Sequence, residues 1–315
     1  MLNAYRDRLS AVLNNAFLPK SAHFFLSLSM IFLLVALCAS IMMFMVFGIL
    51  KATFGVTDMA VLLRQGDLLH FVAFLMSQSI IMAVGAFLLP SFAFYWLQRQ
   101  SYFQSALWNH LPSLRQLNIS LALMLFTALF IPLLVEAFTA IPLPESLTWL
   151  KNGQSLNDDL MDSLFQKADG FRYFLLILFV ALLPAIAEES FFRGTLQQSF
   201  LKSMSPSAAI VTSALCFSLF HGQFNNFLAI WWMGIILGFI CFFTQSLWPS
   251  VVAHFLNNFV TISGKLAITK GWLYQSGKDS FYDSFLICVP AGILMCLCLW
   301  LLAKKTVYIQ GPEQL

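Results

Sequence analysis

Two carboxylates and a guanidinium lie together in an otherwise apolar stretch, as Glu188, Glu189 and Arg193 of the sequence A-E-E-S-F-F-R-G. A helix brings residues four apart onto one face, so we expect Glu189 to pair with Arg193, the acid preceding the base. Glu188 lies about 100° away around the same helix and has no cation at helical spacing. A carboxylate in an apolar setting is suited to act as a general base, which makes Glu188 a candidate for catalysis. The alternative is that the three charges mark the water interface at the end of a membrane helix.

Two histidines follow on separate apolar segments. His221 ends the run F-S-L-F-H, with Phe217 one helical turn before it. His254 and Asn258 are four residues apart in H-F-L-N-N, so a helix directs both polar groups to one side. Taken singly, a histidine at a helix end is usually structural, and an asparagine in a membrane helix often holds two helices together. Their occurrence together with Glu188 favours a catalytic interpretation.

A carboxylate, two imidazoles and an amide can hydrolyse a peptide bond without a serine or cysteine nucleophile. A carboxylate with an imidazole holds and deprotonates water, and imidazole and amide N–H groups bind the oxyanion of the tetrahedral intermediate. Other protease signatures are missing, since the sequence contains no HExxH, no GxSxG and no pair of aspartates within apolar segments. The residues therefore predict a water-activating endopeptidase.

The three motifs in this order resemble those of the CAAX prenyl protease and bacteriocin-processing (CPBP, Abi-type) intramembrane proteases, a family that includes the type II CAAX prenyl endopeptidases. The family motifs EExxxR, FxxxH and HxxxN/D correspond here to Glu188–Arg193, Phe217–His221 and His254–Asn258. Each motif is short, but three of them in order within apolar segments are a strong signal. The resemblance covers residues 172–262, which is under a third of the chain.

The resemblance implies a division of labour among these residues. Glu188 is expected to act as the general base and His221 to help hold the attacking water. His254 and Asn258 are expected to bind the oxyanion. The neighbouring Glu189–Arg193 ion pair is expected to support the helix that presents the base.

Members of this family are often called metalloproteases. A catalytic zinc ion usually has three protein ligands and one water, and Glu188, His221 and His254 are the residues that would supply those ligands here. Each of them lies on a separate apolar segment, whereas the zinc-binding HExxH pattern places two histidines on one helix face. Asn258 beside His254 suits a pair of neutral hydrogen-bond donors better than a metal shell. We therefore expect that no cofactor is required, with Zn²⁺ as the alternative.

The composition places the chain in a lipid bilayer. Of its 315 residues, 60% are hydrophobic and 10% are charged, and the mean hydropathy is +0.81. Soluble domains are about 45–50% apolar and about 25% charged. The net charge of +3 is small and scattered, with no basic stripe, so nucleic acid is not an expected partner. The six cysteines lie in apolar runs without CxxC spacing, so neither a thiolate metal site nor a disulfide framework is predicted.

Apolar runs long enough to cross a bilayer, about 20 residues each, predict an all-α polytopic membrane protein with about eight transmembrane helices around an intramembrane catalytic cavity. They lie at 24–50, 71–97, 117–141, 172–187, 207–225, 227–246, 248–264 and 282–303. The lysines and arginines of the connections slightly favour both termini on the inside. We expect an integral protein of a bacterial-type inner or plasma membrane.

The longest polar stretch, 142–171, divides the chain. We expect an N-terminal membrane region at 1–171, a catalytic core at 172–264, and a final span with the C-terminal tail at 265–315, all within one integral membrane unit. The predicted function is an intramembrane endopeptidase that acts on a membrane-associated or lipidated protein or peptide, with the bilayer as its other partner. The alternative is a catalytically silent scaffold, or an immunity or regulatory protein, of the same fold.

Overall fold

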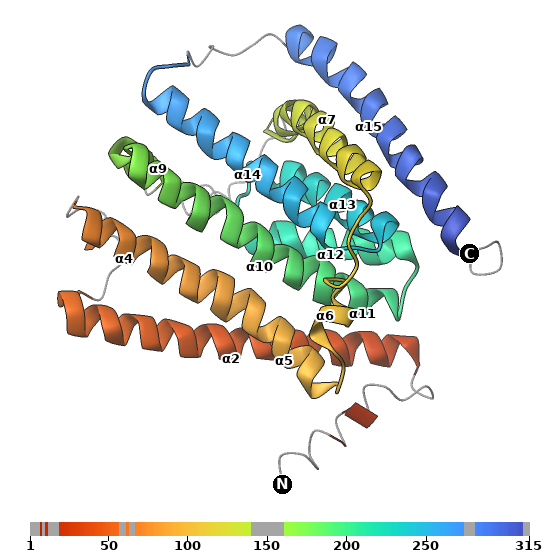
Figure 1. Cartoon of the computed structure of the whole chain (residues 1–315), viewed down its shortest axis with the longest axis horizontal. Helices are drawn as coiled ribbons and strands as arrows, with labels where there is room; N and C mark the ends of the chain where they lie inside the picture. The colour runs from red at the N-terminus through yellow and green to blue at the C-terminus, as the bar shows by residue number, and fades with distance from the viewer. Residues whose placement is uncertain are drawn as a thin grey trace. The chain divides into compact units, whose positions relative to one another are not determined.

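The computed structural model describes residues 19–56, 67–139, 161–273 and 281–310, together with residues 7, 10, 11, 61 and 62. Throughout these residues the regular secondary structure is helical, with no strand (Figure 1). Seven of the described helical segments are long and apolar enough to cross a membrane. They are Ser21–Phe54, Leu68–Leu97, Leu114–Thr139, Gly170–Leu201, Phe227–Thr244, Trp248–Thr269 and Leu286–Lys304. The prediction of an all-α polytopic protein is confirmed, and the chain is an integral membrane protein.

The contacts of the chain divide it into two compact units. Unit 1 comprises residues 1–111 and 174–213, and unit 2 comprises residues 112–173 and 214–315. Unit 1 contains α2 (Lys20–Phe54), α4 (Leu68–Ser79), η1 (Ile80–Leu88), α5 (Leu89–Leu97), α6 (Tyr102–Ser105), η3 (Ile177–Leu182), α10 (Leu183–Phe191), η4 (Phe192–Gln197) and α11 (Gln198–Leu201). Unit 2 contains α7 (Leu114–Thr139), α13 (Phe227–Thr244), α14 (Trp248–Thr269) and α15 (Phe281–Gln310), and the chain passes between the units within α9 (Gly170–Leu176) and α12 (Pro206–His221). The predicted boundaries after 171 and 264 divide the chain by function rather than by contacts, and they stay a prediction.

The fourth predicted span is longer than the sequence indicates. The sequence predicts it at 172–187, and the structure continues it as one apolar helical segment from Gly170 to Leu201. Glu188 and Arg193 therefore lie inside a candidate span rather than at its end. The helix can continue through this region because opposite charges four residues apart neutralise each other, as described below.

The fifth predicted span is shorter than expected. In place of 207–225 the structure has α12, a 16-residue apolar helix that ends at His221. Gly222 ends it by adopting a left-handed backbone conformation with φ of 61°, which glycine accepts without strain. Most of the predicted polar stretch 142–171 lies outside the described residues.

In two of the spans a π-helical stretch lies almost directly before a proline. η1 precedes Pro90 of α5, and η3 precedes Pro184 of α10. A proline ring has no N–H to donate and crowds the carbonyl of the preceding turn, and a wider turn relieves that crowding. A third π-helical stretch, η4, follows α10 without a proline. The helix that carries both site glutamates is therefore flanked by widened turns on each side.

The core of unit 1 joins its long helices through an aromatic cluster. α2 packs along η1 and α5, and α10 packs on η1 (Figure 1). Gly85 permits the close approach of η1 to α2, because a Cβ there would lie 2.9 Å from Cβ of Met42. The Phe87 ring lies 5.4 Å from the Phe191 ring and 5.6 Å from the Phe192 ring, centroid to centroid. This cluster anchors the end of α10 to the second span.

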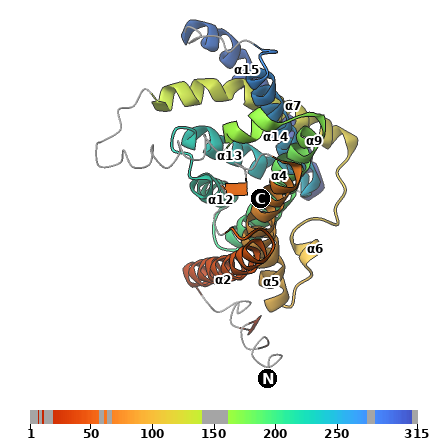
Figure 2. The ribbon, with the colours of Figure 1, turned by 90° about the vertical axis from the view of Figure 1, so that its left-hand side faces the viewer.

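Unit 2 is built around α7, which packs against α13, α14 and α15 (Figure 2). Phe130 of α7 contacts Trp232 of α13, with ring centroids 6.0 Å apart. Gly234 of α13 lies against α12, where a Cβ would come within 3.0 Å of the Ala214 Cβ. The small residue therefore sets how closely α12 and α13 pack.

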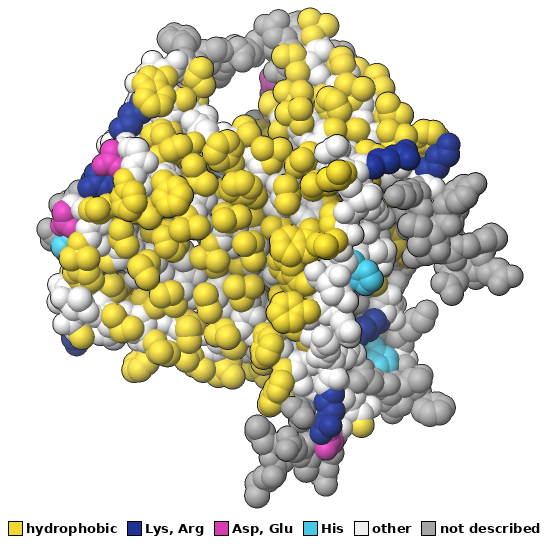
Figure 3. Space-filling view, viewed as in Figure 1, with side chains coloured by type: hydrophobic (Ala, Val, Ile, Leu, Met, Phe, Trp, Pro, Cys, Tyr) yellow, Lys and Arg dark blue, Asp and Glu magenta, His cyan; other side chains and the backbone are white. Residues whose placement is uncertain are grey.

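Large apolar side chains point outward along the helices. Phe44 is 82% exposed, Leu33 is 68% exposed and Leu286 is 72% exposed. Figure 3 shows hydrophobic side chains over most of the visible helix surface, with the charged side chains toward its margins. Such a surface is suited to contact with lipid chains rather than with water.

Candidate active site

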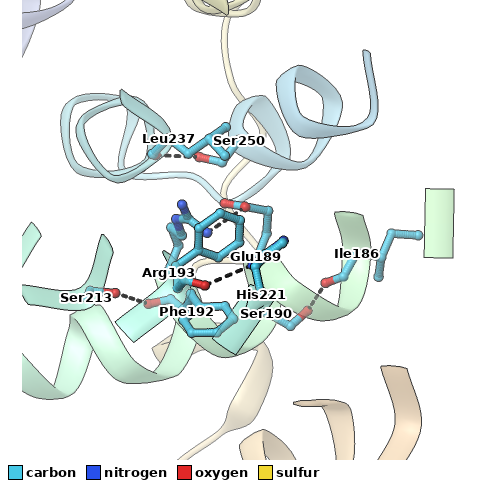
Figure 4. A network of polar contacts seen from close by, with 10 residues as sticks. Ile186, Glu189, Ser190, Phe192, Arg193, Ser213, His221, Leu237 and Ser250 are labelled. Carbon is cyan, nitrogen blue, oxygen red and sulfur yellow. Dashed lines mark hydrogen bonds and ion pairs between the residues drawn. The ribbon is translucent and has the colours of Figure 1, made fainter. Parts of the chain in front are cut away.

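Unit 1 holds the carboxylate motif on α10 and the first turn of η4. The Glu189 carboxylate accepts a hydrogen bond from Arg193 Nη1 at 2.9 Å, and the two side chains are 0% and 1% exposed (Figure 4). The ion pair predicted from the four-residue spacing is therefore confirmed. Glu188, one position earlier, is half-buried. The two neighbouring carboxylates thus occupy different surroundings.

Two hydroxyl groups hold the backbone on either side of Arg193. Ser213 Oγ donates to the carbonyl of Phe192 at 3.0 Å, and the Tyr95 hydroxyl donates to the carbonyl of Gly194 at 2.5 Å. All four of these residues are buried. Because these partners lie far apart in sequence, no spacing pattern indicates them, and the sequence analysis missed both Tyr95 and Ser213. They position the turn that carries the buried guanidinium.

Unit 2 brings the two histidine motifs together at one aromatic ring. The Phe217 ring centroid lies 4.4 Å from that of His221 and 5.8 Å from that of His254, the latter edge to face. His221 Nδ1 lies 2.9 Å from the carbonyl oxygen of Phe217. A carbonyl oxygen can only accept, so Nδ1 carries the hydrogen, and in the neutral ring Nε2 is the acceptor.

Two serines fix the helices that carry these histidines. Ser218 Oγ donates to the carbonyl of Phe227 at 2.8 Å, which ties α12 to the start of α13. Ser250 Oγ donates to the carbonyl of Leu237 at 3.2 Å, which ties α14 to α13 (Figure 4). Both serines are buried. α13 thus acts as the common support for His221 and His254, a role that the sequence analysis did not assign.

Asn258 lies one turn after His254 on α14, as its spacing predicts. His254 is buried, with 1% of its surface exposed, and Asn258 is half-buried. An imidazole and an amide at adjacent turns of one face can both donate hydrogen bonds to the same acceptor. The oxyanion role expected for the pair stays a prediction.

The structure therefore brings the predicted residues together in two groups. Glu188, Glu189 and Arg193 lie together in unit 1, and His221 lies with His254 around Phe217 in unit 2. The approach of Glu188 to the histidines stays a prediction. In the described part of the chain, no group of three or more His, Cys, Asp or Glu side chains lies close enough to hold a metal ion. Both the metal-free scheme and the zinc alternative stay predictions.

The family model of the Rce1-like type II CAAX prenyl endopeptidases matches residues 170–260. The match begins with α9, ends within α14 and contains all three motifs. Residues 170–260 are related to the CAAX proteases. At the level of the family, this relationship indicates a CAAX-type intramembrane protease and hence a hydrolase. No curated protein and no solved structure matches the chain.

The matched range, residues 170–260, contains both groups of residues. It covers the buried ion pair of unit 1 and the aromatic contact of unit 2, together with α13 that supports it. The first three spans lie outside the matched range. The second of them, in unit 1, supplies Tyr95 and the Phe87 ring, which support the carboxylate helix.

Proposed function

We propose that the chain is an intramembrane endopeptidase that hydrolyses a peptide bond with a water molecule activated by Glu188 and His221. His254 and Asn258 bind the oxyanion, and the Glu189–Arg193 pair supports the helix of the base. The relationship of residues 170–260 to the CAAX proteases supports the class of reaction. The observation that carries the proposal is the contact of one ring, Phe217, with both His221 and His254.

The hydrogen bond of His221 supports its role toward water. Because Nδ1 donates to the carbonyl of Phe217, the neutral ring presents Nε2 as an acceptor. An acceptor can orient a water molecule by accepting a hydrogen bond from one of its O–H groups. The second O–H of that water then points its proton toward a base, which is the role proposed for Glu188.

The short length of α12 supports the access of water to His221. Sixteen residues of helix rise roughly 24 Å, whereas the hydrocarbon core is about 30 Å thick. A helix that begins at one surface therefore ends below the other, and the polar residues Gln223, Asn225 and Asn226 follow it. Irregular backbone at membrane depth is tolerated where it is buried in protein or lines a water-filled cavity.

The proposed chemistry balances without a covalent enzyme intermediate. Glu188 takes a proton from water as the water oxygen bonds to the scissile carbonyl carbon. The carbonyl oxygen becomes an oxyanion that accepts hydrogen bonds from His254 and Asn258. Glu188 then delivers the proton to the leaving nitrogen as the C–N bond breaks, which regenerates the carboxylate.

The substrate class follows from the location of the residues in the membrane. A membrane-associated or lipidated protein or peptide can reach a site on these helices, and we place the chain in a bacterial-type inner or plasma membrane. Both termini are proposed to lie inside, with α12 counted as a crossing. Reporters inserted at residues 204 and 224 would then lie on opposite sides, and reporters on the same side would refute this orientation.

We further propose that no zinc ion is required. A carboxylate and an imidazole can activate water alone. If zinc is bound, Glu188, His221 and His254 are its expected ligands, and it would supply Lewis-acid activation of the water. Stoichiometric zinc in purified active protein, with activity lost on chelation and restored by zinc, would overturn this part of the proposal.

The proposal is tested by replacing the general base in the full-length chain. Glu188→Gln keeps the shape of the side chain and removes its basicity, so uncleaved precursors should accumulate in the membrane proteome, as they should in cells that lack the gene. The matched control is Glu136→Gln, which changes a half-buried glutamate in the span Leu114–Thr139 outside the proposed site. Cells with this control should process the same proteins as cells with the natural chain.

The comparison needs equal amounts of each variant in the membrane, measured by immunoblot. Processing that continues at the natural rate in Glu188→Gln would contradict the proposed base. That outcome would favour a catalytically silent role for the chain if cells lacking it also show no precursors.

A further inference from the structure

A polar pocket opens in unit 1 apart from the residues of the proposed active site. Its volume is about 360 Å³. The residues that line it are Tyr95, Gln100, Ser105, Gln198, Leu201 and Lys202, all from unit 1. Five of the six have polar side chains, one is a cation and none is acidic. This lining is suited to an anionic ligand.

The pocket lies where two candidate spans end. The span Leu68–Leu97 ends just before Gln100, and the span Gly170–Leu201 ends beside Lys202. The ends of spanning helices lie at the level of the lipid headgroups, where lysines and polar aromatic groups gather. A ligand that enters here can therefore come from the bilayer itself.

Lys202 brings a positive charge to the pocket. No ion pair joins Lys202 to any residue that the structure describes, whereas Arg99 pairs with Asp7. Although much of the Lys202 side chain is exposed, protein atoms around the ammonium reduce its hydration and lower the pKa of Lys202 from its ordinary 10.5. A partly desolvated cation gains from binding an anion.

The end of α11 does not need the Lys202 ammonium as a cap. The carbonyl of Ser199 accepts the backbone N–H of Lys202 at 3.3 Å, and the carbonyl of Phe200 accepts that of Ser203 at 2.9 Å. Two of the last carbonyls of the helix are thus already satisfied by the following turn. The side chain of Lys202 is left to interact with what enters the pocket.

Two of the lining side chains are held in place by the chain itself. The Tyr95 hydroxyl donates to the carbonyl of Gly194, and Gln198 Nε2 donates to the carbonyl of Arg193 at 3.1 Å. These bonds orient the walls of the pocket before a ligand arrives. Ser105, at the end of α6, adds a hydroxyl group to the lining.

We propose that this pocket binds the phosphate group of an anionic phospholipid headgroup, with the Lys202 ammonium and the Ser105 hydroxyl as donors. Among the described residues, none that lines the pocket is acidic and none forms an ion pair with Lys202, which selects an anion. The position at the ends of two spans selects a lipid over a soluble ion. The inference does not rest on the proposed protease activity.

The test measures binding to the purified, delipidated full-length chain by titration calorimetry. The probes are short-chain phosphatidylglycerol, short-chain phosphatidylcholine and inorganic phosphate. A hydrogen bond to a charged group is stronger than one between neutral groups, and solvent weakens it at an exposed site, so Lys202→Gln should weaken phosphatidylglycerol binding roughly tenfold. Lys202→Arg keeps the charge and should retain binding.

The matched control is Lys51→Gln, which removes an exposed lysine from the last turn of α2 in the same unit. This variant should bind phosphatidylglycerol as the natural chain does, and both phosphatidylcholine and inorganic phosphate should bind more weakly than phosphatidylglycerol. Equal losses in Lys202→Gln and Lys51→Gln, or equal affinity for the two lipids, would overturn the proposal. Inorganic phosphate that binds as tightly as the lipid would show that the ligand is a soluble anion and overturn the lipid assignment.

Discussion

The carboxylate motif of unit 1 and the histidine motifs of unit 2 are held by different forces. Glu189 and Arg193 form a buried ion pair in a turn whose carbonyls accept hydrogen bonds from Ser213 and Tyr95. His221 and His254 instead both contact the Phe217 ring. A buried ion pair supports the helix that carries the proposed base, Glu188. Aromatic packing positions His221, which is proposed to hold the water, and His254, which is proposed to bind the oxyanion.

This difference predicts how each region should respond to a substitution. A buried ion pair that loses one partner leaves an uncompensated charge, so damage to unit 1 should lower stability. A ring replaced by an aliphatic side chain of similar size keeps most of its burial energy, so damage around Phe217 should spare stability and misplace the imidazoles. Three sets of variants test the contrast.

The largest expected loss of stability comes from Arg193→Ala. Breaking a fully buried ion pair typically costs about 3–5 kcal/mol, because the remaining charge stays buried without its partner. Thermal unfolding in detergent should show a much lower Tm than for Arg115→Ala, which removes an exposed arginine from α7. The double variant Glu189→Leu with Arg193→Met should recover part of the loss, and a Tm for Arg193→Ala equal to that of the control would contradict the role of the pair.

A smaller loss of stability, with a larger loss of turnover, is expected for Phe217→Leu. Apolar swaps of similar volume usually cost less than about 1.5 kcal/mol. Turnover should fall because both imidazoles lose the surface that aligns them. Phe239→Leu is the control, since that ring stacks on Phe243 rather than on a histidine. Equal turnover in the two variants would contradict the claim that the Phe217 ring aligns the two imidazoles.

Part of this contrast could be predicted from the sequence. The spacing of Glu189 and Arg193 indicates their contact, because residues four apart on a helix must be neighbours. The contact of Phe217 with His254 could not be predicted, since it depends on how α12 and α14 pack against α13. The sequence also places the end of the fourth span too early, because charged residues are typical of a water interface and the burial of Glu189 and Arg193 depends on how the helices pack.

The smallest effects are expected at two exposed helix starts, one in each unit. Asp67 accepts the backbone N–H of His70, and Asp169 accepts that of Arg172, and these bonds lower the pKa of each carboxyl from its ordinary 3.8. A lowered pKa gives stability that is present above the ordinary pKa and is lost as the pH falls through the lowered value. The Tm difference between the natural chain and Asp67→Asn or Asp169→Asn should therefore be small at pH 6 and shrink below about pH 3.8. A difference that grows on acidification would refute this assignment.

The central proposal is that Glu188 and His221 act together in one hydrolytic reaction. A double-variant cycle tests it directly, with Glu188→Gln, His221→Ala and both together, on a substrate found in the proteome comparison. Residues that act as one unit show strongly non-additive losses, so the account predicts that the double variant is about as slow as either single variant. Losses of turnover that multiply in the double variant would show that Glu188 and His221 act independently and would contradict the account.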